Sequence, residues 1–244
     1  PDTVQEIAAA AARCVVEDGM EYGPAKRRAV RDLGLGPRTP LPDNDQLEAA
    51  VREYIQIFAA DTQPGELLAL RQLAQDWMQR LAEFRPHLSG AVWRGTATRH
   101  SDVHLQLYCD DPKSAEIHLI NLGLDYQVGA SAGPRGEQVD VLSLSVPCPG
   151  LGEHVGVHLS ILDRDDLRGA LRHDAQGLSP RGDLKALTQQ ALAQFGVAIE
   201  QVDVAARART AEHEHDGVAA LRADRRRHHR RRQIVGDEGE MVDA

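Results

Sequence analysis

The chain has 244 residues and a formal net charge of −9, from 28 Lys and Arg against 37 Asp and Glu. Its length suits one large domain or two small ones with a sizeable core, and its acidity argues against a protein that coats nucleic acid. No run of about 18 apolar residues occurs, so we expect no membrane-spanning helix. The three cysteines are far apart and form no CxxC pair, which favours a reducing compartment, and we expect a cytoplasmic protein of bacterial type.

The first 88 residues are predicted to form a helical region. Apolar residues recur there at helical spacing, and glycines or prolines follow where each helix should end. A proline-rich connector, residues 36–44, separates the second helix from the third. The predicted helices cover approximately residues 4–18, 24–33, 45–58 and 64–85.

After Gly90 the period changes, and residues 89–205 are predicted to form an α+β domain. Val103–Cys109 alternates between apolar and polar residues, as a half-buried strand does. Asp111 and Pro112 are typical of the start of a helix, which should run to about Leu122. Further strands are predicted at 91–93, 125–128, 139–146 and 155–162, further helices at 164–172 and 182–195, and a turn-rich loop at 129–136. We therefore expect a small mixed sheet flanked by helices, with the helical region before it.

The last residues, 206–244, are rich in Arg, His, Asp, Glu and Ala and contain few large apolar residues. Such a composition cannot offset its ordering entropy by burial, so we predict a disordered tail. A second explanation is that the tail is not native sequence, since it resembles an out-of-frame translation of GC-rich DNA. The basic run Arg225–Arg232 would bind nucleic acid only nonspecifically.

The most informative motif lies between residues 90 and 105. A short apolar segment leads to Gly95-Thr96, a polar turn follows, and Ser101-Asp102 opens the alternating strand. This order resembles the signature of the DNA-polymerase-β-like nucleotidyltransferase superfamily, in which Gly-Ser or Gly-Gly follows a strand and Ser-Asp-x-Asp begins the next one. The resemblance covers roughly residues 88–165, with a helical segment on the N-terminal side.

The resemblance implies a role for each matching residue. Gly95 and Thr96 would approach the phosphates of an NTP, and the nearby Arg99 would supply positive charge. Asp102 matches the first carboxylate, His104 stands at the second position, and Asp140 is the candidate for the third. These three would hold Mg²⁺, which bridges the phosphates and activates the attacking hydroxyl. The implied function is transfer of a nucleotidyl group from an NTP to an acceptor that the sequence does not identify.

His104 opens an alternative, because imidazole is a poor ligand for Mg²⁺ and removes one negative charge from the site. The chain would then be a catalytically degenerate nucleotidyltransferase-fold protein with a binding or regulatory role. The simpler interpretation of Asp102 is also structural: carboxylates at the start of a strand commonly accept hydrogen bonds from turn N–H groups.

Two other hypotheses come from other parts of the sequence. Residues 6–34 resemble the start of a TetR-type regulator, whose helix-turn-helix binds DNA. The residues that would contact phosphates there are Lys26, Arg27, Arg28 and Arg31. Four histidines also suggest a transition-metal site with Asp102, in which His154 and His158 join His100 or His104.

Overall fold

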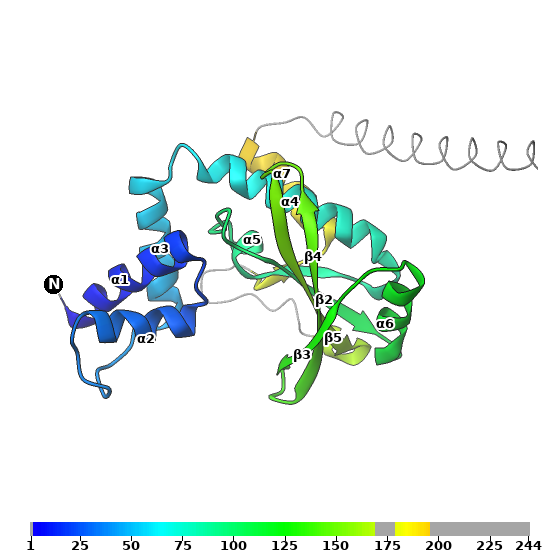
Figure 1. Cartoon of the computed structure of the whole chain (residues 1–244), viewed down its shortest axis with the longest axis horizontal. Coiled ribbons are helices and arrows are strands. Elements are labelled where there is room, and N and C mark those ends of the chain that lie inside the picture. The colour runs from blue at the N-terminus through cyan, green and yellow to red at the C-terminus, as the bar shows by residue number, and fades with distance from the viewer. Residues whose placement is uncertain (1, 169–178, 196–244) are drawn as a thin grey trace, which may run out of the picture. The chain divides into compact units, whose positions relative to one another are not determined.

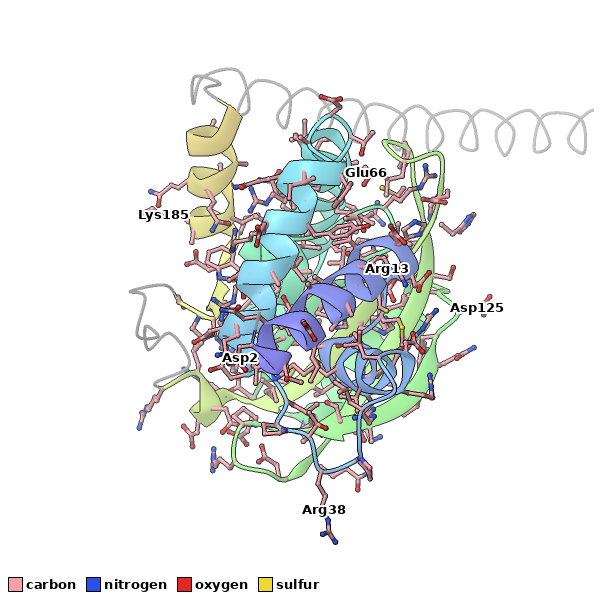
Figure 2. All side chains as sticks on the ribbon, turned by 90° about the vertical axis from the view of Figure 1, so that its left-hand side faces the viewer. Asp2, Arg13, Arg38, Glu66, Asp125 and Lys185 are labelled. Atoms are coloured by element: carbon pink, nitrogen blue, oxygen red, sulfur yellow. The ribbon has the colours of Figure 1, made fainter. Side chains whose placement is uncertain are left out.

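Three helices pack against one another at the N-terminal end of the chain (Figure 1). The computed structural model describes residues 2–168 and 179–195. The carboxylate of Asp2 caps the first helix and Gly19 ends it at φ 64°, while the third begins with a reciprocal capping box between Asp43 and Gln46. In the connector between the second and third helices, Arg38 points away from the ribbon (Figure 2). These helices are α1 (Thr3–Asp18), α2 (Tyr22–Asp32) and α3 (Asn44–Phe58).

The predicted fourth helix is also present, and a short helix follows it where we predicted a strand. Residues 91–93 are not a strand but the centre of a helical turn that places Val92 and Trp93 in the core. Three apolar residues cannot distinguish strand from helix by period. The glycines on either side, Gly90 at φ 71° and Gly95 at φ 80°, reverse the chain and end the turn. The segment contains α4 (Gln63–Arg80), η1 (Ala82–Phe84), β1 (His87–Ser89) and α5 (Gly90–Arg94).

The rest of the described chain builds a six-stranded mixed sheet in the order β3-β4-β5-β2-β1-β6. Strands β2 and β5 are parallel, and all other pairs are antiparallel. The α+β fold with helices beside a mixed sheet is therefore confirmed. The elements are β2 (Val103–Cys109), α6 (Pro112–Asn121), β3 (Gln127–Ala132), β4 (Gln138–Cys148), β5 (Glu153–Asp163), η2 (Arg164–Leu167), β6 (Arg181–Gly182) and α7 (Leu184–Phe195).

Two further boundaries differ from the predictions. The predicted loop at 129–136 is half strand, because β3 continues to Ala132 before the chain turns into β4. The predicted helix at 164–172 is only the short turn η2, and its later residues lie outside the described part of the chain. Small residues such as those at 129–132 have low strand propensity, so pairing with β4 decides their conformation.

The two faces of the sheet differ in character. On one face, which we call the core face, Leu105, Leu142 and Leu159 are at most 2% exposed, and helices α4 and α6 contact it. The opposite face, which we call the polar face, carries the alternate residues of the same strands. Its members include His104 and Gln106 of β2, Ser143 of β4, and His158 and Ser160 of β5.

The described residues up to Ala191 form one compact unit, and those from Leu192 belong to a second. The domain boundary predicted at residue 88/89 stays a prediction. Among the described helices, none combines the length and the apolar character needed to cross a membrane. The three cysteines are free and buried. The tail predicted at 206–244, with its arginine run, lies outside the described residues.

Candidate functional site

Asp102 lies immediately before β2, and both of its carboxylate oxygens have partners on β5. Oδ1 accepts the backbone N–H of Gly156 at 3.0 Å, and Oδ2 lies 3.0 Å from Nε2 of His158. The hydrogen bond with His158 is the main reason why the pKa of Asp102 is lowered, although burial opposes it. Asp102 is therefore a carboxylate held in an ion pair with an imidazole.

His158 lies between Asp102 and Ser143. Its other ring nitrogen, Nδ1, is 2.9 Å from the hydroxyl oxygen of Ser143 on the neighbouring strand β4. The cross-strand register explains the contact, because Ser143 and His158 are direct partners and so share the polar face. Asp102, His158 and Ser143 thus form a continuous hydrogen-bonded row across three strands, which we call the relay.

His104 stacks on the other side of His158, since these two residues are direct partners in the parallel pair of β2 and β5. Their ring centroids are 4.9 Å apart and the planes are tilted by 22°. The pKa values of the two rings move in opposite directions. Burial lowers the pKa of His104, with a further decrease from the charge of His158, whereas the hydrogen bond to Asp102 raises that of His158. Of the two rings, His158 is therefore the one that gains a proton more readily.

The helical region reaches this cluster at the loop between α1 and α2. Glu21, which precedes α2, has its carboxylate 3.9 Å from Nε2 of His104. At Gly19 a Cβ would come within 2.5 Å of the carbonyl oxygen of His100, so only glycine allows this close approach. Thr98 also donates its hydroxyl to the carbonyl of Val16 at 3.3 Å. The end of α1 therefore fixes the loop that leads into β2.

Of the two predicted phosphate contacts, Thr96 is buried and Gly95 is half-buried. Thr96 is 3% exposed and faces Tyr22, whose pKa is raised mainly by burial. The carbonyl of Gly95 accepts a hydrogen bond from the Gln63 amide at 3.2 Å. These contacts join the turn to Tyr22 of α2 and Gln63 of α4, directly after α5.

Arg99, the predicted source of positive charge, is half exposed and already paired. Its guanidinium lies 3.2 Å from the carboxylate of Glu153 at the start of β5, and its backbone N–H donates to Glu66. Figure 2 places Glu66 at one end of α4. Arg99 thus ties the loop before β2 to α4 and β5.

Asp140 does not join Asp102 and His104. It lies three residues before Ser143 on β4, so it faces the core side of the sheet with Leu142. Moreover, β5 separates β4 from β2 in the strand order. The strand that adjoins β2 is β5, and its residue beside His104 is His158. The structure therefore does not bring the three predicted metal ligands together.

The residues present do not fit Mg²⁺, which prefers oxygen ligands. Within residues 2–168 and 179–195, no group of three or more His, Cys, Asp or Glu side chains could hold a metal ion. The alternative histidine site is not assembled either. His154 shares the face of His158, but it lies four residues, or about 13 Å, along the strand, and His100 packs its carbonyl against Gly19.

The basic residues of the TetR-like segment are partly used inside the helical region. Lys26 is 8% exposed and donates to the side chain of Asn44 at 2.8 Å. Arg28 lies 2.8 Å from the carboxylate of Asp18. Two of the four predicted phosphate contacts therefore connect α2 to its neighbouring helices, and DNA binding through this segment stays a prediction.

Ser143 and Gly156 were not among the predicted site residues, and His158 was predicted only as part of a metal site. The available signal was the alternation of β4 and β5, which puts Ser143 and His158 on polar positions. The register that makes them neighbours depends on strand pairing between distant segments. A glycine opposite Asp102 has no recognisable local pattern.

Comparison with known proteins yields a distant likeness to solved structures. No family model matches the chain, and no curated protein matches it. Among solved structures, the chain is similar to the Cid1 poly(U) polymerase with MgGTP bound, in a study of UTP selectivity, at 19% identity and a TM-score of 0.28. The match covers 41% of this chain and 33% of that one, so the chain spans about a third of the polymerase. A likeness this distant assigns neither ligand nor activity to the present chain.

Proposed function

We propose that the chain is a catalytically degenerate protein of nucleotidyltransferase-like fold, with a binding or regulatory role and no metal-dependent nucleotidyl transfer. The observation that carries this proposal is the position of His158. Its imidazole occupies the Asp102 oxygen that would otherwise be available to a cation, at 3.0 Å. A histidine pair and one carboxylate replace the group of carboxylates that Mg²⁺ requires.

Charge supports the same conclusion. Asp102 shifts the pKa of His158 upward and burial shifts that of His104 downward, so at most one of the two rings gains a charge, which Asp102 balances, and Glu21 adds a negative charge beside His104. The cluster therefore offers no net positive charge to a triphosphate, and Arg99 is already paired with Glu153. Without a divalent ion, an NTP would meet a neutral or acidic surface, which opposes binding.

The alternative, an active transferase that uses Asp102 and Asp140 with Mg²⁺, needs both carboxylates on one metal. They lie on opposite faces of the sheet, and β5 lies between their strands. Closing that separation would require breaking the pairing of β4 with β5. No observation among the described residues favours that rearrangement.

Isothermal titration of the full chain with each NTP, with and without Mg²⁺, tests the proposal. We expect no Mg²⁺-dependent heat of binding for the native chain. The double variant His104→Asp/His158→Asp restores carboxylates beside Asp102 and should gain Mg²⁺ binding. His154→Asp is the matched control, because it adds a carboxylate on the same strand and face but away from Asp102. Mg²⁺-dependent NTP binding by the native chain that Asp102→Asn abolishes would overturn the proposal.

A further inference from the structure

We propose that Ser143 is a nucleophile, activated by His158 and Asp102, that accepts an acyl group from an ester and passes it to water. This activity goes beyond the proposed binding role and needs neither a nucleotide nor a metal. It uses residues of three adjacent strands that lie in one row on the polar face.

The order of the hydrogen bonds is the one that a nucleophile and its base require. Ser143 lies 2.9 Å from Nδ1 of His158, and Nε2 of the same ring lies 3.0 Å from Asp102. A carboxylate can only accept, so neutral His158 carries its proton on Nε2 and leaves the lone pair on Nδ1. That lone pair faces the Ser143 hydroxyl, which donates to it. Asp102 thus fixes the tautomer in which the His158 ring can act as a base, as the carboxylate does in known serine triads.

The ring of His158 is also held in place from the side. His104 stacks against it with centroids 4.9 Å apart, and Gly156 donates its N–H to the Asp102 oxygen that His158 does not use. The hydrogen bond that His158 donates to Asp102 raises the pKa of His158, which makes the neutral ring a stronger base. His104 therefore orients the ring, Gly156 positions Asp102, and Asp102 makes His158 a stronger base.

A donor for the developing oxyanion stands on the next strand. Gln127 of β3 is the direct cross-strand partner of Ser143, so the two side chains leave the same face of the sheet. Direct partners have Cβ atoms roughly 4.5–5.5 Å apart, and a glutamine amide carries two N–H donors. Gln127 is exposed and can turn its amide towards a carbonyl oxygen on Ser143.

The relay is accessible to a small ester from solvent. The side chain of His158 is 27% exposed, that of Asp102 is 47% exposed, and Ser143 is half-buried. The partners of Ser143 on either side are Gln127 and His158, which places the oxyanion donor and the base on opposite sides of the nucleophile. This arrangement suits attack on a planar carbonyl from above the sheet.

The reaction balances with water as the only co-substrate. Ser143 Oγ forms a bond to the ester carbonyl carbon while its proton moves to Nδ1 of His158. The tetrahedral adduct then breaks its bond to the alkoxy oxygen, and His158 returns that proton to the leaving alcohol. Water attacks the acylated serine in the same way, giving its proton to Nδ1. Release of the acid restores the serine hydroxyl, so one ester and one water become one acid and one alcohol.

Covalent labelling of the full chain tests the proposal. A serine-reactive fluorophosphonate is incubated with the native chain, the modified peptide is identified by mass spectrometry, and release of nitrophenol from p-nitrophenyl acetate is followed in parallel. We expect the label on Ser143, with an initial acylation rate about 100-fold lower in Ser143→Ala and in His158→Asn. The matched control is Ser145→Ala, which changes an exposed serine on the same strand and face. Circular dichroism confirms that each variant is folded.

Two results would overturn the proposal that Ser143 is a nucleophile. One is a native chain that labels at no serine, or at Ser145 as readily as at Ser143. The other is a His158→Asn variant that remains folded and still acylates at the native rate. Both readouts omit nucleotide and metal, so they are independent of the NTP titration. A failed relay would leave the proposed binding role unchanged, and Mg²⁺-dependent NTP binding would not by itself produce a label on Ser143.

Discussion

Replacing Gly156 with alanine should break the relay without removing any of its members. A Cβ at this position would lie 2.6 Å from Oδ1, 2.7 Å from Cγ and 2.9 Å from Oδ2 of Asp102. These separations are too short for real contacts, so one group must move. Because the carboxylate ends a short side chain at a half-exposed site, it should rotate away rather than distort the strand. We therefore expect Gly156→Ala to separate Asp102 from His158.

The size of the effect decides which measurement to use. A half-exposed, charge-assisted pair such as Asp102–His158 contributes about 1 kcal/mol, between the values for exposed and shielded pairs. Replacing glycine with alanine within a strand raises the unfolding free energy by roughly 0.5–1 kcal/mol, because glycine loses more conformational freedom on folding. The unfolding free energy should therefore change little, and stability alone is a poor readout. Loss of the pairing, however, removes the main cause of the raised pKa of His158, so that pKa should fall.

Titration of the histidine ring protons by NMR measures that decrease directly, with the His158 resonance assigned from its absence in His158→Asn. Gly129→Ala is the matched control: it also places alanine in a strand, but its Cβ would have only an ordinary contact, at 3.9 Å from the carbonyl oxygen of Val141. We expect the raised pKa of His158 in the native chain and in the control, and a lower value in Gly156→Ala. An unchanged His158 pKa in folded Gly156→Ala would refute the inference that Asp102 controls this imidazole.

Three further predictions concern stability. Because the pKa of Asp102 is lowered and that of His158 is raised, their pairing should stabilise the chain most between about pH 4 and 6.5, with the contribution lost below and above. Urea unfolding of the native chain and His158→Asn should therefore differ least at pH 9, and a difference that does not vary with pH would contradict this. Gln63→Leu removes the donor to two loop carbonyls and should lower the unfolding free energy by about 1–3 kcal/mol in the same assay, whereas an unchanged urea midpoint would mean that the loop does not depend on it. Gly182→Ala would push a Cβ into the tryptophan ring of α5 and should lower the melting temperature, whereas Gly36→Ala, with open space around it, should not.

Much of the helical region could be predicted because its signals are local. The caps at Asp2 and Asp43 and the end at Gly19 are all within a few residues of the helices that they bound. The apolar spacing then gives the buried face of each helix without any knowledge of its neighbours. What the sequence does not contain is how the end of α1 meets the loop before β2, since that contact joins Gly19 to His100 across about 80 residues of chain.

The sheet was predictable as a set of strands but not as an ordered array. Alternation predicts that Val103–Cys109 and the two later strands each have one buried face, and burial follows that pattern. Strand order and register depend on pairing between segments that are tens of residues apart, and a shift of one residue exchanges the faces. Asp140 illustrates the limit. The alternation of β4 shows that Asp140 shares a face with Leu142, but the sequence does not show that β5 lies between β4 and β2.

Asp102 shows why a motif can indicate where a site lies without determining its chemistry. The chemistry of a carboxylate depends on what lies beside it, and the neighbour of Asp102 is supplied by a strand 56 residues away. A carboxylate at the position of His158 would repel Asp102 and invite a divalent cation between them. The imidazole there pairs with Asp102 and turns its second nitrogen towards Ser143. One residue on β5 thus separates a metal centre from a hydrogen-bonded relay on the same backbone, which is why the binding titration and the serine label need to be measured separately.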